Sequence, residues 1–213
     1  MDSPRFLTAI FVVLVCQVAA SAQPALGLRS SVGALLFSNQ NYSSEWIEEL
    51  AVTRELDSAG IQEVSLSFSN AVLDYSDPWL ALNGSSVNSL RGHFQPVLAG
   101  YRYYFRPRDV RFRFFSGVDA GSVRFAGAVR SSGPSVGGSE TISQETSFTR
   151  WRTAAGVSVG GEVNFATRWS VSFSYRYLYV SELGDFAAGA SAKSFHGGPV
   201  NAHALLLGVS NRF

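Results

Sequence analysis

The sequence predicts an all-β protein, an antiparallel up-and-down barrel of eight strands that crosses a membrane. Three observations support this prediction. Large apolar residues alternate with small polar ones at a period of two along much of the chain. The connections between these stretches are alternately short and long, as in barrels whose neighbouring strands are joined at opposite ends. The apolar face carries the aromatic residues, whereas the other face carries glycine, serine and single arginines.

The first 22 residues have the form of a cleavable signal peptide. A short segment with one arginine precedes the apolar run 6–15, and the triplet Ala-Ser-Ala at 20–22 matches the small-x-small pattern of a cleavage site. We therefore predict cleavage between Ala22 and Gln23, which leaves residues 23–213 as the barrel domain. The alternative is a retained helical anchor, but that needs about 20 apolar residues.

Four strands are expected in the first half of the mature chain. Leu26–Phe37 is the first, and residues 64–69 alternate apolar residues with serine. Residues 90–105 place Leu98, Gly100 and Arg102 opposite a face that contains two tyrosines. Residues 46–56 are less clear. They contain four charged side chains, and their pattern is compatible with a strand or a short helix.

The second half supplies four more strands, at residues 110–126, 150–165, 169–179 and 204–213. In 169–179, aromatic and valine side chains occupy one face, and three serines and Arg176 occupy the other. The short connections are residues 57–60, 106–109 and 166–168. Three long polar loops are expected at 74–89, 127–147 and 181–201, and a shorter one at 38–45. With eight strands, side chains fill the interior of such a barrel.

The composition of the two faces predicts which one points inward. The polar face has too many glycines and serines for a surface in water, and its charges stand singly among small residues, as a cramped interior requires. Aromatic residues near the strand ends would form the girdles of a lipid-facing wall. We therefore expect the polar face inside. The alternative is a soluble, secreted, lipocalin-like binding barrel with its apolar face inside.

Nine charged residues are expected to form a network in the barrel interior: Arg102, Arg111, Arg113, Asp119, Arg150, Arg152, Glu162, Arg176 and Arg212. Buried charges must be paired or hydrated. One interpretation is a network of salt bridges and water that plugs the barrel. The other is a very narrow, anion-preferring pore, because seven arginines face only two carboxylates in this set.

Three segments, together with the signal peptide, carry a resemblance to a known group. They are LAGYRYYF at 98–105, the strand 169–179 with its SYRY core, and the ending LGVSNRF at 207–213. The chain resembles the bacterial small outer-membrane β-barrel superfamily, which includes the OmpA transmembrane domain and the opacity-type porin-family proteins. Asn211 departs from the pattern, since an apolar residue usually stands there.

The resemblance implies a location in the bacterial outer membrane and a structural or surface-interaction role, with long loops outside the cell. It also implies that Phe213 is the signal recognised by the barrel assembly machinery. The expected partners are outer-membrane lipid, that machinery and an unidentified external ligand of the loops. A nucleic-acid partner is not expected, because 16 acidic residues match the 17 basic ones.

No enzymatic activity, cofactor or metal site is predicted. The lipid A deacylases resemble this barrel class and carry a His-x-Ser-Asn motif, but Ser181 has no histidine two residues before it. His93, Asp77 and Ser85 or Ser86 include the residue types of a Ser-His-Asp catalytic triad, although nothing in their spacing requires them to form one. Three scattered histidines match no metal-ligand spacing. A lipid-modifying enzyme on the same fold remains the alternative function.

Overall fold

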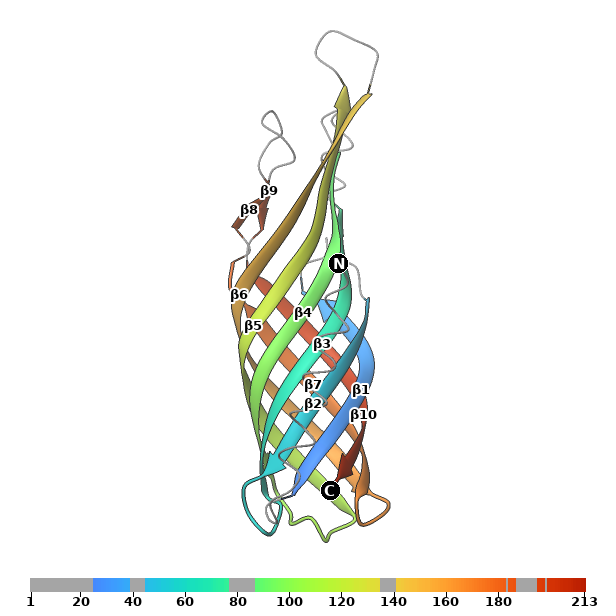
Figure 1. Cartoon of the computed structure of the whole chain (residues 1–213), viewed down its shortest axis with the longest axis vertical. Coiled ribbons are helices and arrows are strands. Elements are labelled where there is room, and N and C mark those ends of the chain that lie inside the picture. Colours follow the sequence, from blue (N-terminus) through green and yellow to red (C-terminus); the bar gives the residue numbers. More distant parts are fainter. Residues whose placement is uncertain are drawn as a thin grey trace.

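The computed structural model describes residues 25–38, 45–76, 87–134, 141–182, 184–186, 195–197 and 199–213. Within them, eight strands form a closed barrel in the order β1-β10-β7-β6-β5-β4-β3-β2 (Figure 1). Every neighbouring pair is antiparallel. The barrel strands are β1 (Leu26–Phe37), β2 (Glu45–Glu55), β3 (Gln62–Ser76), β4 (Val87–Tyr104), β5 (Phe112–Pro134), β6 (Thr141–Asn164), β7 (Trp169–Val180) and β10 (Val200–Arg212).

The predicted eight-stranded barrel is confirmed. Two further short strands, β8 (Gly184–Phe186) and β9 (Phe195–Gly197), pair with each other outside the barrel. The described residues contain no helix that is long and apolar enough to cross a membrane. The predicted signal peptide and its cleavage point between Ala22 and Gln23 lie outside the described residues.

The segment that was compatible with either a strand or a helix is a strand. β2 pairs with β1 along one edge and with β3 along the other. Its buried residues, Ile47, Glu49, Ala51, Thr53 and Glu55, alternate along the strand. The segment forms a strand despite its charge because its residues alternate with a period of two and both of its edges are hydrogen-bonded. Its buried carboxylates, Glu49 and Glu55, form ion pairs inside the barrel.

The expected loop at residues 127–147 is wrong over most of its length. β5 and β6 stay paired from Phe112↔Val163 to Pro134↔Thr141, so these two strands extend well beyond the others (Figure 1). They contain 23 and 24 residues, whereas β1 and β7 contain 12 each. A sheet with water on both faces needs no apolar face, and its serine- and threonine-rich sequence therefore has the composition of a loop.

The other two long connections are also more ordered than expected. β3 and β4 remain paired as far as Ser76↔Ser89. The connection from β7 to β10 contains the β8–β9 hairpin. β3 to β6 therefore project beyond the barrel wall as one sheet at the end opposite to the C-terminus (Figure 1).

The short connections lie at the end of the barrel that holds the C-terminus (Figure 1). In the β2–β3 turn, the Asp57 carboxylate accepts hydrogen bonds from the backbone N–H groups of Ile61 (3.1 Å) and Gln62 (2.6 Å). Slight burial raises the pKa of the Asp57 carboxyl, but these N–H donors outweigh it and hold the pKa below its ordinary value. Gly60 completes the turn with a φ of 64°, which glycine adopts without strain.

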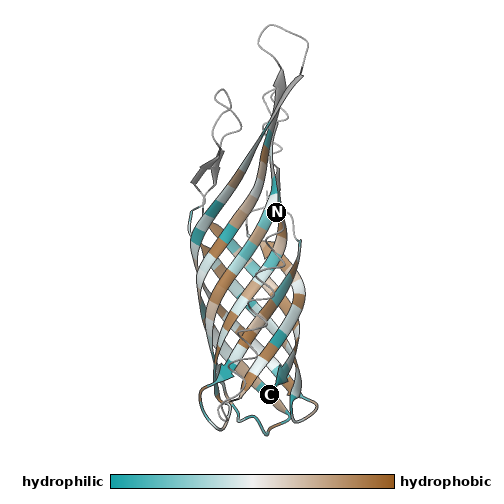
Figure 2. Cartoon of the chain, in the orientation of Figure 1, coloured by the Kyte–Doolittle hydropathy of each residue, from teal (hydrophilic) through white to brown (hydrophobic). Residues whose placement is uncertain are grey.

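Inside the barrel, two layers of different chemistry follow each other along the axis. Apolar side chains fill the half nearer the projecting sheet, and charged side chains fill the half nearer the short turns. Hydrophilic and hydrophobic residues form successive bands along the barrel strands (Figure 2). The predicted inward direction of the polar face is thus found in the half of the barrel near the short turns.

Candidate functional site

Glu162 lies at the centre of the charged layer. Its side chain is fully buried, and its carboxylate accepts hydrogen bonds from Arg113 (3.0 Å), from Arg212 and from the hydroxyl of Tyr104 (3.0 Å). Arg113 also donates to the carbonyl of Gly60 (2.6 Å), and its guanidinium lies 3.7 Å from the centre of the Tyr104 ring. Strands β4, β5, β6 and β10 and the β2–β3 turn therefore meet at one carboxylate.

A second group of charges crosses the barrel from β7. Arg176 donates to Glu49 on β2, and its Nε lies 3.2 Å from a carboxylate oxygen of Asp119 on β5. Ser69 donates a further hydrogen bond to Glu49 (3.2 Å). These contacts connect strands on opposite sides of the barrel, so the interior at this level is occupied by side chains.

A third pair connects β1 with β3. Arg29 lies 2.6 Å from Glu63, and both side chains are 2% exposed. Arg29 also donates to Ser210 on β10 (3.2 Å). Glu55 at the end of β2 lies 2.9 Å from Arg108 and 3.4 Å from Arg212.

The buried charges of the described residues balance. Five arginines (Arg29, Arg102, Arg113, Arg176 and Arg212) and five carboxylates (Glu49, Glu55, Glu63, Asp119 and Glu162) are buried. The predicted excess of seven arginines over two carboxylates in the interior is therefore wrong, and with it the argument for an anion-preferring pore. Arg29, Glu49, Glu55 and Glu63 are buried charges that were not predicted, because the pattern of residues 46–56 is compatible with a helix and the alternation in the first strands is weaker.

Six of the nine predicted interior charges are buried, and three lie elsewhere. Arg102 is buried with its guanidinium 4.5 Å from the centre of the Phe115 ring. Arg111 is exposed instead, because β5 begins at Phe112 and leaves Arg111 in the preceding turn. Arg150 and Arg152 are half-buried on the part of β6 beyond its pairing with β7, and Arg152 donates to the carbonyl of Glu182 (2.5 Å).

The apolar layer was not anticipated. The Phe94 ring lies 5.3 Å from that of Phe125 and 5.6 Å from that of Phe37, in edge-to-face contacts. The surrounding buried cluster comprises Leu35, Ile47, Ala71, Leu73, Leu98, Val123, Val129, Ala154, Leu178, Val180, Val200, Ala202, Ala204 and Leu206. Phe94 and Val123 are 0% exposed, so the layer closes the barrel above the charges. The sequence does carry a signal for this layer: the apolar residues alternate on the same face of each strand as the buried charges, as Leu98 and Arg102 do on β4.

The outer wall is apolar. Among the described residues, 25 large apolar or aromatic side chains are exposed, including Phe173 at 58%. Near the short turns the wall ends in aromatic residues: Phe105, Phe112, Phe114, Phe165, Trp169 and Phe213. Phe213 itself donates its backbone N–H to the carbonyl of Leu26 (2.8 Å) and so extends the seam between β10 and β1.

At the other end, the wall gives way to polar residues hydrogen-bonded between strands. On one side, His203 of β10 contacts the hydroxyls of Ser38 (2.8 Å) and Tyr175 (2.6 Å). On another side, Gln95 of β4 links Asn70 of β3 to Arg124 of β5. The apolar wall therefore ends in aromatic residues near the short turns and in hydrogen-bonded polar residues at the other end.

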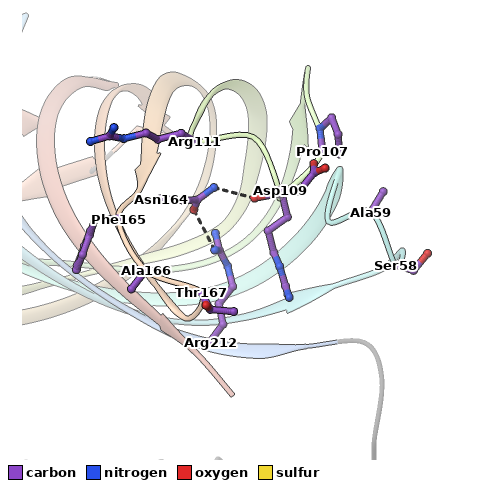
Figure 3. A pocket seen from close by; sticks show the side chains of 11 residues that line it. Ser58, Ala59, Pro107, Asp109, Arg111, Asn164, Phe165, Ala166, Thr167 and Arg212 are labelled. Carbon is purple, nitrogen blue, oxygen red and sulfur yellow. Dashed lines mark hydrogen bonds between the residues drawn. The ribbon is translucent and has the colours of Figure 1, made fainter.

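An open pocket of about 830 Å³ lies at the short-turn mouth, between the β2–β3, β4–β5 and β6–β7 turns (Figure 3). Asn164 donates to the carbonyls of Arg108 and Val110 (both 2.9 Å) and accepts a hydrogen bond from Arg212 (3.2 Å). These contacts join the turns to the charged layer, so the pocket ends at that layer.

The residues that could be drawn as a Ser-His-Asp set are not brought together in the described structure. His93 is exposed on β4, whereas Asp77, Ser85 and Ser86 lie outside the described residues. Ser181 accepts a hydrogen bond from Thr153 (3.2 Å). In the part of the chain that the structure describes, no group of three or more His, Cys, Asp or Glu could hold a metal ion.

Comparison with known proteins shows the fold. No family model matches the chain, and no curated protein matches it in sequence. Among solved structures, the chain is similar to a major outer-membrane protein from Thermus thermophilus, with 14% identity over 89% of this chain and 100% of that one and a TM-score of 0.56. It is also similar to Neisserial surface protein A, with 11% identity over 90% of this chain and 100% of that one and a TM-score of 0.52. The chain thus has the fold of small outer-membrane barrels.

Proposed function

We propose that the chain is an integral protein of the bacterial outer membrane with a structural or surface-interaction role and no catalytic activity. In this proposal the barrel wall lies in lipid, the short turns face the periplasm, and the projecting sheet of β3 to β6 faces the exterior. The barrel serves as an anchor, and the sheet carries the surface on which an external partner binds.

The observation that carries the proposal is the inverted burial of the barrel. Arginines and carboxylates are buried inside, whereas valine, leucine and aromatic side chains are exposed around the outside. Monomeric soluble proteins rarely expose contiguous apolar patches larger than a few hundred Å², and a wall of this kind is stable only against lipid. A soluble, lipocalin-like barrel would need the opposite arrangement.

The orientation follows from the two ends. Outer-membrane barrels have short periplasmic turns and longer extracellular segments. The three short turns lie together at one end, and the longest strands, β5 and β6, extend at the other (Figure 1). External binding is favoured at the projecting sheet because its strands extend beyond the barrel wall.

The packed interior disfavours the pore. Two consecutive layers fill the barrel: balanced ion pairs near the periplasm and the apolar cluster around Phe94 and Phe125 above them. Passage of an ion would require displacing both. We therefore include no steady conductance in the proposed function.

One observation favours the alternative, a lipid-modifying enzyme. Ser38 and His203 form a serine–histidine pair at the outer edge of the apolar wall. Activation of Ser38 would need its hydroxyl to donate to Nε2 of His203 while Nδ1–H donates to Tyr175. A neutral phenol cannot stabilise an imidazolium as a carboxylate does, which disfavours catalysis.

Fractionation of cells, followed by electrophoresis of unheated and boiled outer-membrane material, tests the membrane barrel. A heat-modifiable band in the detergent fraction is expected. A soluble protein without a mobility shift would contradict the proposal. Planar bilayers then test for conductance, and lipid hydrolysis by the purified barrel, lost in both Ser38→Ala and His203→Ala, would establish the enzyme instead.

A further inference from the structure

A hydrogen-bonded polar row crosses three strands on the outside of the barrel. Gln95 of β4 donates to the side-chain carbonyl of Asn70 on β3 (3.1 Å) and accepts a hydrogen bond from Arg124 on β5 (2.9 Å). Trp151 of β6 is directly opposite Arg124 in the β5–β6 register and is 54% exposed. The row therefore fixes a guanidinium beside an exposed indole.

This row lies at the outer edge of the apolar wall. Toward the short turns, the next outward residues on β3 and β4 are Phe68 and Val97. On β5 the small residues Ser122 and Ala120 lie between Arg124 and the exposed Val118. Elsewhere on the barrel, Leu36 and Leu205 end the wall in the same way, just before Ser38 and His203. In a bilayer, the first polar level above an apolar wall lies among the lipid headgroups, where tryptophan is also enriched.

Arg124 differs from the other arginines on this face. Arg91 lies 3.5 Å from Asp74, and Arg130 lies 2.8 Å from Glu145. Among the described residues Arg124 forms no ion pair, and its guanidinium donates to the neutral amide of Gln95. Its positive charge is thus uncompensated at the level of the headgroups.

The surroundings of Arg124 leave room for an anion. Ala126 and Ala128 follow it on the outward face of β5, and the exposed His93 is opposite Ala126 in the register. The small side chains of Ala126 and Ala128 thus lie among Arg124, His93 and Arg91, which bring two guanidinium groups and an imidazole to this part of the outer face. A guanidinium presents several N–H donors in a fork that matches a phosphate group.

We propose that Arg124, with His93 and Trp151 beside it, binds the phosphate of an anionic lipid headgroup in the outer leaflet. The inference rests on the proposed membrane location, because only a lipid would bring its phosphate to the edge of an apolar wall. The acyl chains of that lipid would lie along the wall below Arg124, and the indole of Trp151 would contact the headgroup region.

The test uses the purified barrel in lipid discs of phosphatidylcholine that contain a minor fraction of phosphatidic acid, whose headgroup is a phosphate monoester. Native mass spectrometry counts the phosphatidic acid molecules that each barrel retains. The variants are Arg124→Gln, which removes the charge, and Arg124→Lys, which keeps it. Arg130→Gln is the matched control, since it removes an exposed but carboxylate-paired arginine from the same face.

We expect the wild-type barrel to retain phosphatidic acid selectively, and Arg124→Gln to bind it about tenfold more weakly, as loss of a charge-assisted hydrogen bond implies. Arg124→Lys should keep part of the selectivity, and Arg130→Gln should match the wild type. Excess inorganic phosphate should leave the retained lipid in place. Equal loss in Arg124→Gln and Arg130→Gln, no selectivity in the wild type, or complete displacement by inorganic phosphate would overturn the proposal.

Insertion is measured first on the same samples, by the heat-dependent mobility of each variant. A wild-type chain that does not enter the discs would refute the proposed function itself. An inserted, heat-modifiable barrel without lipid selectivity would refute only the binding site.

Discussion

Replacing Glu162 with glutamine should destabilise the barrel strongly. The substitution keeps the shape of the side chain and an acceptor for Tyr104, but it removes the negative charge between Arg113 and Arg212. Glu162 is 0% exposed, so water cannot reach the site to solvate the guanidinium groups that lose their partner. Breaking a buried ion pair by removal of one partner costs about 3–5 kcal/mol, and here two guanidinium groups lose the same partner.

The matched control is Glu145→Gln. Glu145 lies 2.8 Å from Arg130 on the projecting sheet, with side-chain exposures of 53% for Glu145 and 64% for Arg130. Exposed pairs of this kind contribute about 0–1 kcal/mol. The two variants therefore make the same chemical change, once in the buried charged layer and once in a solvent-exposed pair.

The free energy of unfolding is measured by reversible urea titration of the refolded barrel in lipid, with the heat-dependent gel mobility as the readout of the folded fraction. We expect Glu162→Gln to lower the free energy of unfolding by about 3–5 kcal/mol. Glu145→Gln should change the free energy of unfolding by no more than about 1 kcal/mol. The double variant Glu162→Gln with Arg212→Gln restores the charge balance and should be more stable than the sum of the two single changes predicts. Equal stability of the two glutamate variants would refute the buried network as a source of stability.

Three further predictions follow from other parts of the fold. Deletion of Phe213, whose N–H extends the β1–β10 seam, should lower the yield of assembled barrel far more than Thr167→Ala in an exposed turn, and equal membrane yields would contradict its role in assembly. Gly33→Ala should cost about 1–3 kcal/mol, because an added Cβ would collide with the backbone of Leu205, and an unchanged midpoint of the gel-mobility transition on heating would contradict this. Asp57→Asn should destabilise the barrel at neutral pH but not in acid. The pKa of Asp57 is lower in the folded barrel than in the unfolded chain, so the ionised carboxylate stabilises the fold at a pH above the ordinary carboxyl pKa of about 3.9. This stabilisation is lost as the pH falls through the lower pKa of the folded state. A stability difference between Asp57→Asn and the wild type that is the same at pH 7 and pH 2 would be inconsistent with that account.

The outward wall could be predicted from local pattern alone. On β7, the alternation from Trp169 to Tyr179 assigns one face to aromatic and valine side chains and the other to serine and Arg176, and the structure has that division. A strand exposes alternate side chains to opposite faces whatever its neighbours are. For the same reason the number of barrel strands and the positions of the short turns could be read from the sequence.

The segments beyond the wall could not be predicted in this way. Residues 127–147 have a loop-like composition, yet most of them pair as β5 and β6. Outside the membrane both faces of a sheet meet water, so selection for an apolar face is absent and the alternation that indicates a strand disappears. Cross-strand backbone hydrogen bonds stabilise this extension, and they leave no mark on side-chain polarity.

The amino-acid sequence by itself determined the class of fold, the apolar wall and the presence of charges on the opposite face, because each is a property of one strand and its period of two. The tertiary structure decided which charges meet. Glu49 and Arg176 are 127 residues apart and form one buried pair, and Arg29 and Glu63 form another across 34 residues. Such pairs depend on barrel closure and on the register between strands, which no local pattern specifies.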